Sequence, residues 1–170
     1  TLGDYHNLFD EFFCHGPNDS EFIKKQFDGV VYEMGYPKYD NYFHNYNNEE
    51  FKNDLLKKHF CNPKKPTILW ICTVSKYFST IETYERAMLK LTEKYNVILR
   101  PHPLEIQLGS SRYNQKVHEI CNSGKFIVTN DPFQNMSDLY LIADKVFCDY
   151  GGSIFSALYL NKDILLMNHK

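Results

Sequence analysis

Residues 67–100 read TILWICTVSKYFSTIETYERAMLKLTEKYNVILR. The stretch begins and ends with short apolar runs, 67–73 and 96–100, whose length and Val, Ile and Leu content are typical of strands buried on both faces. Between them, apolar side chains recur on one helical stripe at Ile81, Tyr84, Met88, Leu91 and Tyr95. Ser79 and Glu82 have the spacing of a capping box that would begin this helix. The stretch therefore predicts a strand, a helix and a second strand.

The same alternation continues downstream. Short apolar runs of strand length lie at 125–129, 145–148 and 163–168, and helical patterns lie at 111–122, 136–143 and 153–161. Strands that alternate with helices in this way are typical of a parallel sheet with right-handed crossovers. The sequence therefore predicts an α/β fold with a Rossmann-like parallel sheet.

The amino-terminal third is organised differently. Runs at 12–16 and 30–34 are predicted strands around a helix at 19–27. The segment GYPKYDNYFHNYNN, residues 35–48, is rich in turn formers and lacks a period, as expected of a linker. A helix follows at 48–60, with Asn48 placed to cap it.

These observations predict the domain organisation. We expect residues 1–34 to be the end of an amino-terminal lobe, 35–62 to be a linker and helix, and 63–170 to be a carboxyl-terminal nucleotide-binding lobe. A doubly wound domain normally continues with a covering helix after a strand such as 163–168, so we expect an incomplete lobe in a sequence truncated at both ends.

Composition excludes several function classes. The 170 residues carry a formal net charge of −2, so no global positive field favours a nucleic-acid backbone. No apolar run approaches the roughly 20 residues that span a bilayer. The five cysteines include no C-x-x-C pair, which is typical of a cytosolic protein and not of a disulfide framework or zinc site. No D-x-D, H-E-x-x-H or G-K-S/T motif is present, so we expect neither a metal nor a cofactor.

The segment Asp149-Tyr-Gly-Gly-Ser153 follows the predicted strand 145–148 and begins the next helix. Ligands of open α/β sheets bind at the carboxyl ends of the strands. Gly151 and Gly152 would let the backbone approach a diphosphate, the helix amino terminus would favour its charge, and Ser153 would add a hydroxyl. The alternative is a tight turn that binds nothing.

A second candidate segment, Arg100-Pro101-His102-Pro103, closes the predicted strand 96–100. The prolines on both sides restrict the backbone of His102. A rigidly held imidazole beside an arginine suits phosphate contact or proton transfer, although a histidine in a structural turn is the alternative. Thr73 and Ser75 follow the predicted strand 67–73 and would face the same cleft, but turn chemistry explains them equally well.

Taken in order, four segments resemble the CDP-glycerol glycerophosphotransferase family, whose members build teichoic-acid-type and related capsular polymers. FDEFFCHGPNDSEFIKKQF is similar to the family's strand, serine-bearing turn and helix. MGYPKYD resembles its GYPRND motif, and LRPHP resembles its K/R-x-HP motif. DLYLIADKVFCDYGGSIFSALYLNKDILL is similar to the block that contains the family's DYSS turn.

The resemblance implies a GT-B fold, in which two Rossmann-like lobes bind the nucleotide donor mainly in the second lobe and no metal is required. His102 would be the HP histidine that contacts the donor phosphate and supports transfer. Asp149, Gly151, Gly152 and Ser153 fall on the phosphate-binding turn, where Gly151 and Gly152 replace the family's paired serines. The family's His-Gly-Thr motif, which would supply the catalytic base, is expected upstream of His15, so we expect this chain to bind donor without turnover.

The implied function is transfer of glycerol phosphate from CDP-glycerol to a polymer or glycan acceptor, in the cytoplasm or peripherally at the inner membrane face. Three alternatives stay open: a UDP-N-acetylglucosamine 2-epimerase-like enzyme, which has a similar D-x-G-G turn, a GT-B sugar transferase, and a non-catalytic nucleotide-binding lobe. The upstream sequence would discriminate among them. The sequence does not decide the nucleotide base, the acceptor or the oligomeric state.

Overall fold

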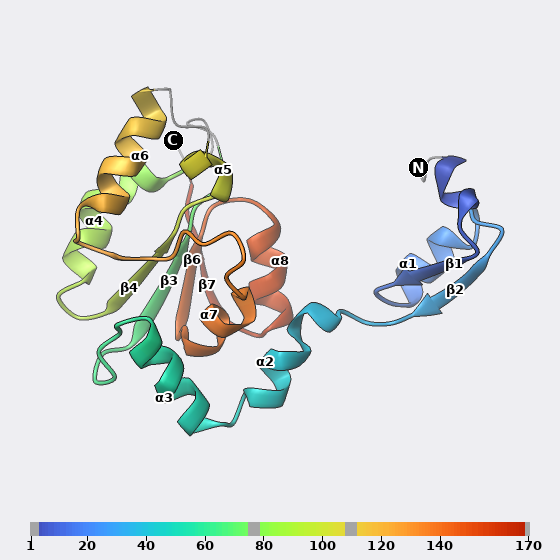
Figure 1. Cartoon of the computed structure of the whole chain (residues 1–170), viewed down its shortest axis with the longest axis horizontal. Helices are drawn as coiled ribbons and strands as arrows, with labels where there is room; N and C mark the ends of the chain where they lie inside the picture. Colours follow the sequence, from blue (N-terminus) through green and yellow to red (C-terminus); the bar gives the residue numbers. More distant parts are fainter. Residues whose placement is uncertain (1–3, 75–78, 108–111, 169–170) are drawn as a thin grey trace. The chain divides into compact units, whose positions relative to one another are not determined.

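The computed structural model describes residues 4–74, 79–107 and 112–168, which belong to two compact units, Thr1–His44 and Asn45–Lys170 (Figure 1). This division groups the helix after Asn48 with the second unit. Each unit is described by itself below.

The first unit is built around a small βαβ arrangement. Its strands β1 (Glu11–Cys14) and β2 (Val30–Glu33) pair in parallel from Glu11↔Val30 to Cys14↔Glu33, with α1 (Pro17–Ile23) between them in sequence. Cys14, Ile23 and Phe27 form the buried cluster of this unit. The 3-10 helix η1 spans Asp4–Leu8.

The segment expected to be a linker is partly helical. The 3-10 helix η2 covers Pro37–Tyr39, and α2 covers Asp40–Asn45. Tyr39 and Tyr42 are each only 1% exposed, so tertiary burial of two aromatic side chains accompanies these turns. Because these helices show no regular apolar period, the sequence pattern missed them.

The second unit contains a five-stranded parallel sheet. Its strands are β3 (Thr67–Ile71), β4 (Asn96–Arg100), β5 (Ile127–Val128), β6 (Lys145–Cys148) and β7 (Asp163–Leu166), in the spatial order β5-β4-β3-β6-β7. Its helices are α3 (Glu49–Lys58), α4 (Ile81–Leu91), α5 (Pro103–Gln107), α6 (Arg112–Asn122), α7 (Met136–Ile142) and α8 (Gly152–Tyr159). This confirms the predicted Rossmann-like α/β fold.

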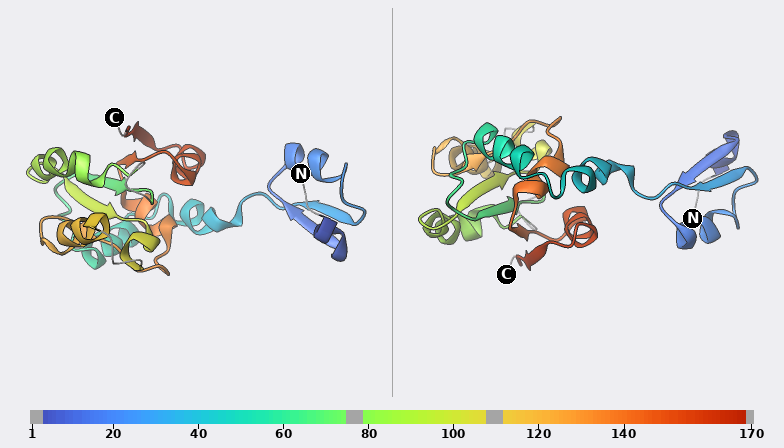
Figure 2. Two further views of the ribbon diagram at one scale, coloured as in Figure 1. Left: turned by 90° about the horizontal axis from the view of Figure 1, so that it is seen from above. Right: turned by 90° about the horizontal axis from the view of Figure 1, so that it is seen from below.

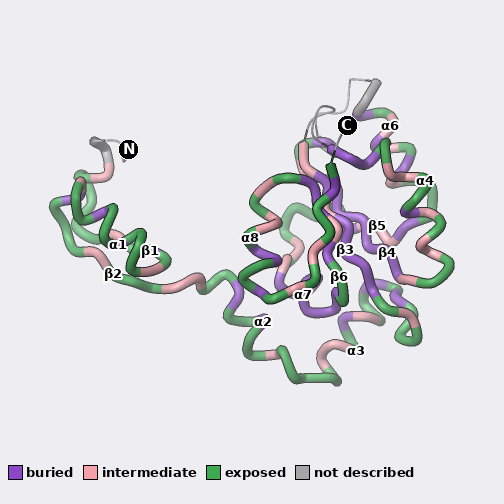
Figure 3. The backbone as a smooth tube through the Cα atoms, turned by 180° about the vertical axis from the view of Figure 1, so that it is seen from behind, coloured by how far each residue is buried: buried purple, intermediate pink, exposed green. Residues whose placement is uncertain are grey.

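Helices lie on both sides of this sheet, as Figure 2 shows. The central strands are the most buried part of the unit (Figure 3). On one face, Ile68, Trp70 and Cys72 of β3 and its end pack in a cluster with Met88 of α4 and Val117 of α6. The alternating β3 residue Leu69 is also fully buried, which explains why this strand has an unbroken apolar sequence.

The helix termini test two capping predictions. Asn48 caps α3, since its Oδ1 accepts a hydrogen bond from the Phe51 amide at 3.0 Å, and this prediction is confirmed. The capping box at Ser79 and Glu82 is wrong. Thr80 is the N-cap residue of α4 and makes no side-chain cap bond, because its hydroxyl donates to Asp149 instead.

Candidate functional site

The strand order defines the point where a ligand of this fold is expected. The chain runs outward from β3 to β4 and β5, then returns to β6 and β7 on the other side of β3. The carboxyl ends of β3 and β6 therefore flank the topological switch point of the sheet, where open α/β sheets bind ligands. Thr73 follows β3 and the 149–153 turn follows β6, so these two segments meet at that point.

The glycine turn after β6 presents backbone to open space. Gly151 is the N-cap residue of α8 and Gly152 is the first residue of that helix. A Cβ atom added to Gly152 would meet nothing within 4 Å, and one added to Gly151 would meet only the Thr73 Oγ1 atom, at 3.9 Å. The first-turn amides of a helix lack intrahelical acceptors and lie at its positive end. The turn is therefore physically suited to hold an anion.

Ser153 is attached to its surroundings through both backbone and side chain. Its carbonyl accepts a hydrogen bond from the Tyr140 hydroxyl at 3.2 Å, which ties α8 to α7. Burial raises the pKa of the neighbouring Cys148 thiol, Asp149 raises it further, and a hydrogen bond with Ser153 opposes the shift. Burial likewise raises the pKa of Cys72 well above its ordinary value. Both thiols are therefore neutral near pH 7 and unsuited to nucleophilic chemistry.

Asp149 has a role that the sequence did not indicate. Its side chain is 1% exposed, and its Oδ2 atom accepts hydrogen bonds from the Thr73 amide at 2.8 Å and from the Thr80 amide at 3.1 Å. Its Oδ1 atom accepts from the Thr80 hydroxyl. The carboxylate thus joins the turn after β3, the start of α4 and the end of β6. It positions the walls of the candidate site.

Arg100 is also held by backbone. Arg100 is only 6% exposed, and its Nη1 atom donates to the carbonyl oxygens of Thr129 and Asp131, both at 2.8 Å. Burial lowers the pKa of Arg100, and the nearby Asp131 opposes that shift. These bonds connect the end of β4 to the segment after β5. Arg100 therefore fixes this part of the sheet edge whether or not it also contacts a ligand.

His102 lies at the start of α5, half-buried. The Leu104 amide donates to its Nδ1 atom at 3.2 Å, and the Glu105 amide donates to its carbonyl at 2.9 Å. Because Nδ1 accepts, the neutral ring carries its proton on Nε2. The local backbone thus selects the tautomer in which Nε2–H is the donor.

The structure brings together only part of the predicted set. Thr73, Asp149 and Gly151 lie in one connected cluster. Arg100 ends β4, the strand next to β3, and His102 follows before α5. Ser75 lies outside the described residues. The sequence did not predict the contact between Thr80 and Asp149. Its only local signal at Thr80 was that this residue lies beside the start of a predicted helix. Buried Glu105 was also missed; its carboxylate accepts a hydrogen bond from Asn114 at 2.9 Å and ties α5 to α6.

Two further findings concern the described residues. Among them, no group of three or more His, Cys, Asp or Glu side chains is arranged to hold a metal ion. In the same part of the chain, no helix combines the length and apolar character needed to cross a membrane.

Comparison with known proteins decides the family. The family model for CDP-glycerol:poly(glycerophosphate) glycerophosphotransferase matches residues 12–169. The chain belongs to this family. Three of the four segments that suggested the resemblance lie within this region, and the first, which begins at Phe9, lies in it from residue 12 onward. Among curated proteins, the sequence finds no significant match.

Solved structures support the same fold. The wall teichoic acid polymerase TagF, in a variant crystal soaked with CDPG, matches with a TM-score of 0.66 and 18% identity over 94% of this chain and 38% of that chain. Another TagF variant gives 0.66 and 20% identity over 92% and 39%. The ADP-heptose heptosyltransferase II of E. coli gives 0.51 and 13% identity over 71% and 38%. The chain therefore spans well under half the length of these structures and has the fold of a lobe of such GT-B transferases.

Proposed function

We propose that this glycerophosphotransferase-family chain binds CDP-glycerol at the switch point of its sheet, for transfer of glycerol phosphate to a polymer or glycan acceptor. The observation that carries the proposal is the open glycine turn at the amino terminus of α8, supported from below by buried Asp149. The family supports the reaction class, and the turn supports diphosphate binding at this position.

The proposed chemistry is a direct displacement at the β-phosphorus of the donor. The acceptor hydroxyl oxygen forms a bond to phosphorus, the bond from phosphorus to the bridging oxygen breaks, and cytidine monophosphate leaves. The hydroxyl proton passes to a base on another part of the two-lobed transferase. The first-turn amides of α8, the Ser153 hydroxyl and His102 Nε2–H would stabilise the negative charge on the departing phosphate. Arg100 and Thr73 would complete the phosphate surroundings.

The remaining parts of the proposal concern setting. The partners are the nucleotide-activated donor and the acceptor, with neither nucleic acid nor cofactor involved. The proposed location is the cytoplasm, including peripheral work at the inner membrane face.

Calorimetric titration with CDP-glycerol, cytidine monophosphate and UDP-N-acetylglucosamine tests this proposal. The cytidine ligands should bind. Gly152→Asp should weaken their binding by about 30-fold or more, because the new carboxylate repels the diphosphate and competes with it for the amide hydrogen bonds at the start of α8. Gly152→Asn is the matched control: it has nearly the same size without the charge, and a Cβ at this position meets nothing within 4 Å. Its affinity should change by no more than about fivefold.

Two outcomes would contradict the proposal. Preference for the uridine ligand would indicate an epimerase-like or sugar-transferase site. If Gly152→Asp and Gly152→Asn lowered the affinity for the cytidine ligands equally, the negative charge of the ligand would not lie beside this turn.

A further inference from the structure

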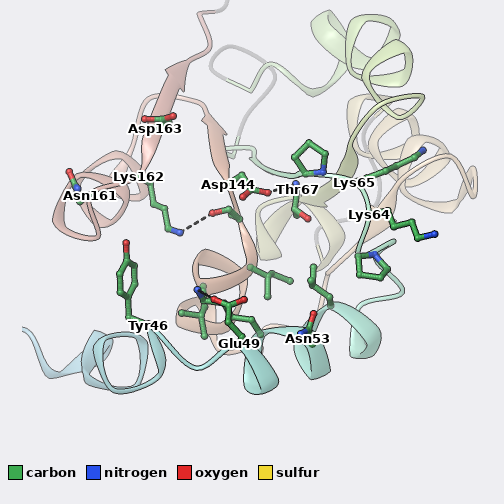
Figure 4. Close-up of a pocket in the computed structure, with 17 residues that line it drawn as sticks. Tyr46, Glu49, Asn53, Lys64, Lys65, Thr67, Asp144, Asn161, Lys162 and Asp163 are labelled. Atoms are coloured by element: carbon green, nitrogen blue, oxygen red, sulfur yellow. Dashed lines mark hydrogen bonds and ion pairs between the residues drawn. The ribbon is translucent and has the colours of Figure 1, made fainter.

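A cavity lies at the amino ends of the strands, opposite the candidate donor site on the same sheet, and is called the amino-edge pocket below. Its volume is about 670 Å³, and it is lined by α3, the segment before β3, the end of α7 and the starts of β6 and β7 (Figure 4). β3 separates the two edges by its five residues, which span roughly 16 Å at about 3.3 Å per residue. No lining residue belongs to the candidate donor site. One small molecule therefore cannot occupy both sites.

Two lysines from different parts of the chain contribute positive charge to the amino-edge pocket. Lys162 precedes β7, and its Nζ atom donates to the Ala143 carbonyl at 2.8 Å. Lys52 of α3 pairs with Glu49 at 3.0 Å. Burial lowers the pKa of Lys162 to about 8, an effect that Asp144 opposes and Lys52 strengthens. Lys52 and Lys162 both line this pocket, so an anion bound in it would meet an ammonium group from each of two elements.

The rest of the lining suits hydroxyl groups. Asp144, Asp163 and Glu49 contribute carboxylates to the lining. Neutral polar groups come from Asn53, Asn161 and the Tyr46 hydroxyl. Asp144 accepts the Thr67 amide at 2.7 Å, which fixes its position. Carboxylates repel a bare phosphate but accept hydrogen bonds from sugar or polyol hydroxyls. Lys64 and Lys65 complete the charged lining on the β3 side.

We propose that the amino-edge pocket binds a small phosphorylated polyol, with its phosphate between Lys52 and Lys162 and its hydroxyls against Asp144 and the neighbouring amides. Figure 4 shows Lys162, Tyr46 and Glu49 around the same opening. The proposal adds a second site to the chain and stands whatever nucleotide the other edge binds.

The test is a titration of the protein with glycerol 3-phosphate, in which binding is monitored by NMR through the ¹⁵N resonances of the lysine side chains. Binding should raise the pKa of Lys162 from about 8, because a phosphate favours the charged ammonium. Lys162→Met, which keeps the apolar stem, should weaken binding by about tenfold, the value of one charged hydrogen bond. Inorganic phosphate and glycerol alone should each bind at least about tenfold more weakly, since each meets only half of the lining.

α3 supplies a matched control. Lys57 pairs with Asp54 at 3.0 Å, three residues away, as Lys52 does with Glu49, but Lys57 does not line the pocket. Lys52→Met should weaken glycerol 3-phosphate binding by about threefold or more, and Lys57→Met should leave it unchanged. Equal effects of the two variants, an unmoved Lys162 pKa, or inorganic phosphate binding as tightly as glycerol 3-phosphate would each overturn the proposal.

The two proposals fail separately. Gly152→Asp should leave glycerol 3-phosphate binding unchanged if this ligand occupies the amino edge. If Gly152→Asp abolished glycerol 3-phosphate binding, the proposal of a site in the amino-edge pocket would be wrong. If the protein bound glycerol 3-phosphate but none of the cytidine ligands, only the proposal of the donor site would be contradicted.

Discussion

Two aspartates bracket β6 and make the same kind of bond to β3, yet their surroundings differ. At the amino end, Asp144 Oδ2 accepts the Thr67 amide at 2.7 Å; at the carboxyl end, Asp149 Oδ2 accepts the Thr73 amide at 2.8 Å. Asp144 is exposed beside the amino-edge pocket, whereas Asp149 is 1% exposed and accepts two further bonds from Thr80. Asp149 therefore accepts three bonds with a buried carboxylate and Asp144 accepts one with an exposed carboxylate, so the two side chains should contribute differently to stability.

The largest expected effect tests this difference directly. Asp149→Ala leaves the Thr73 amide and both donors of Thr80 without their acceptor in a buried place, so we expect the free energy of unfolding to fall by about 3 kcal/mol. Asp144→Ala removes the acceptor of a single donor, the Thr67 amide, so the loss should be smaller, about 1 kcal/mol. Urea unfolding followed by circular dichroism measures both.

Asp149→Asn adds a functional measurement to the same comparison. Its amide oxygen can still accept the Thr73 and Thr80 amides, and its NH₂ group can donate to the Thr80 hydroxyl, so the fold should be kept better than in Asp149→Ala. If Asp149 positions the turn after β3 against α8, cytidine monophosphate affinity should fall in Asp149→Asn and stay unchanged in Asp144→Asn. Similar affinities in these two folded variants would remove Asp149 from the positioning of the site.

How far the sequence predicts this molecule depends on whether a feature is local. β3, β4 and β6 follow from unbroken apolar runs. The place of the candidate site stays a prediction, made from the rule that ligands bind at carboxyl strand ends. The bounds of β5 were predicted less well, because the apolar run covers 125–129 but only Ile127–Val128 pairs in the sheet. The Asp149–Thr80 bond joins residues 69 positions apart, and no local pattern encodes it. The sequence therefore suggested Asp149 as part of the phosphate turn but not its structural bonds.

A smaller effect concerns His102, which lies between the carboxyl end of β4 and the start of α5. In a protein that carries out the proposed transfer, His102→Ala should lower turnover by about tenfold, as expected for loss of a group that stabilises the leaving phosphate. His102→Asn separates chemistry from structure, because its Oδ1 atom can accept the Leu104 amide as Nδ1 does at 3.2 Å. Steady-state kinetics should show both variants impaired. Full activity of His102→Asn would assign His102 to the turn alone.

The smallest effect sharpens the amino edge, through the helix that carries Lys52. His59 ends α3, is 7% exposed, and its Nε2 atom is buried without a hydrogen-bond partner among the described residues. Burial lowers the pKa of His59 below 6.5, Lys58 lowers it further, and Asp138 opposes the shift. The folded protein thus keeps the ring neutral at pH values where the unfolded chain already binds a proton. Stability should therefore fall as pH drops through 6.5 toward the lowered pKa.

Replacement of the ring tests that pH dependence. His59→Gln removes the titrating group, so the decline in the free energy of unfolding between neutral and mildly acidic pH should be shallower than in the unsubstituted protein. His44→Gln, at an exposed histidine, should retain the full decline.

Because α3 also carries Lys52 and Glu49, loss of stability near His59 should affect the amino-edge pocket before the carboxyl ends of the strands. Hydrogen exchange at mildly acidic pH should accordingly rise in α3 while the amides around Asp149 stay protected; simultaneous loss at both edges would show that the two edges unfold as one unit.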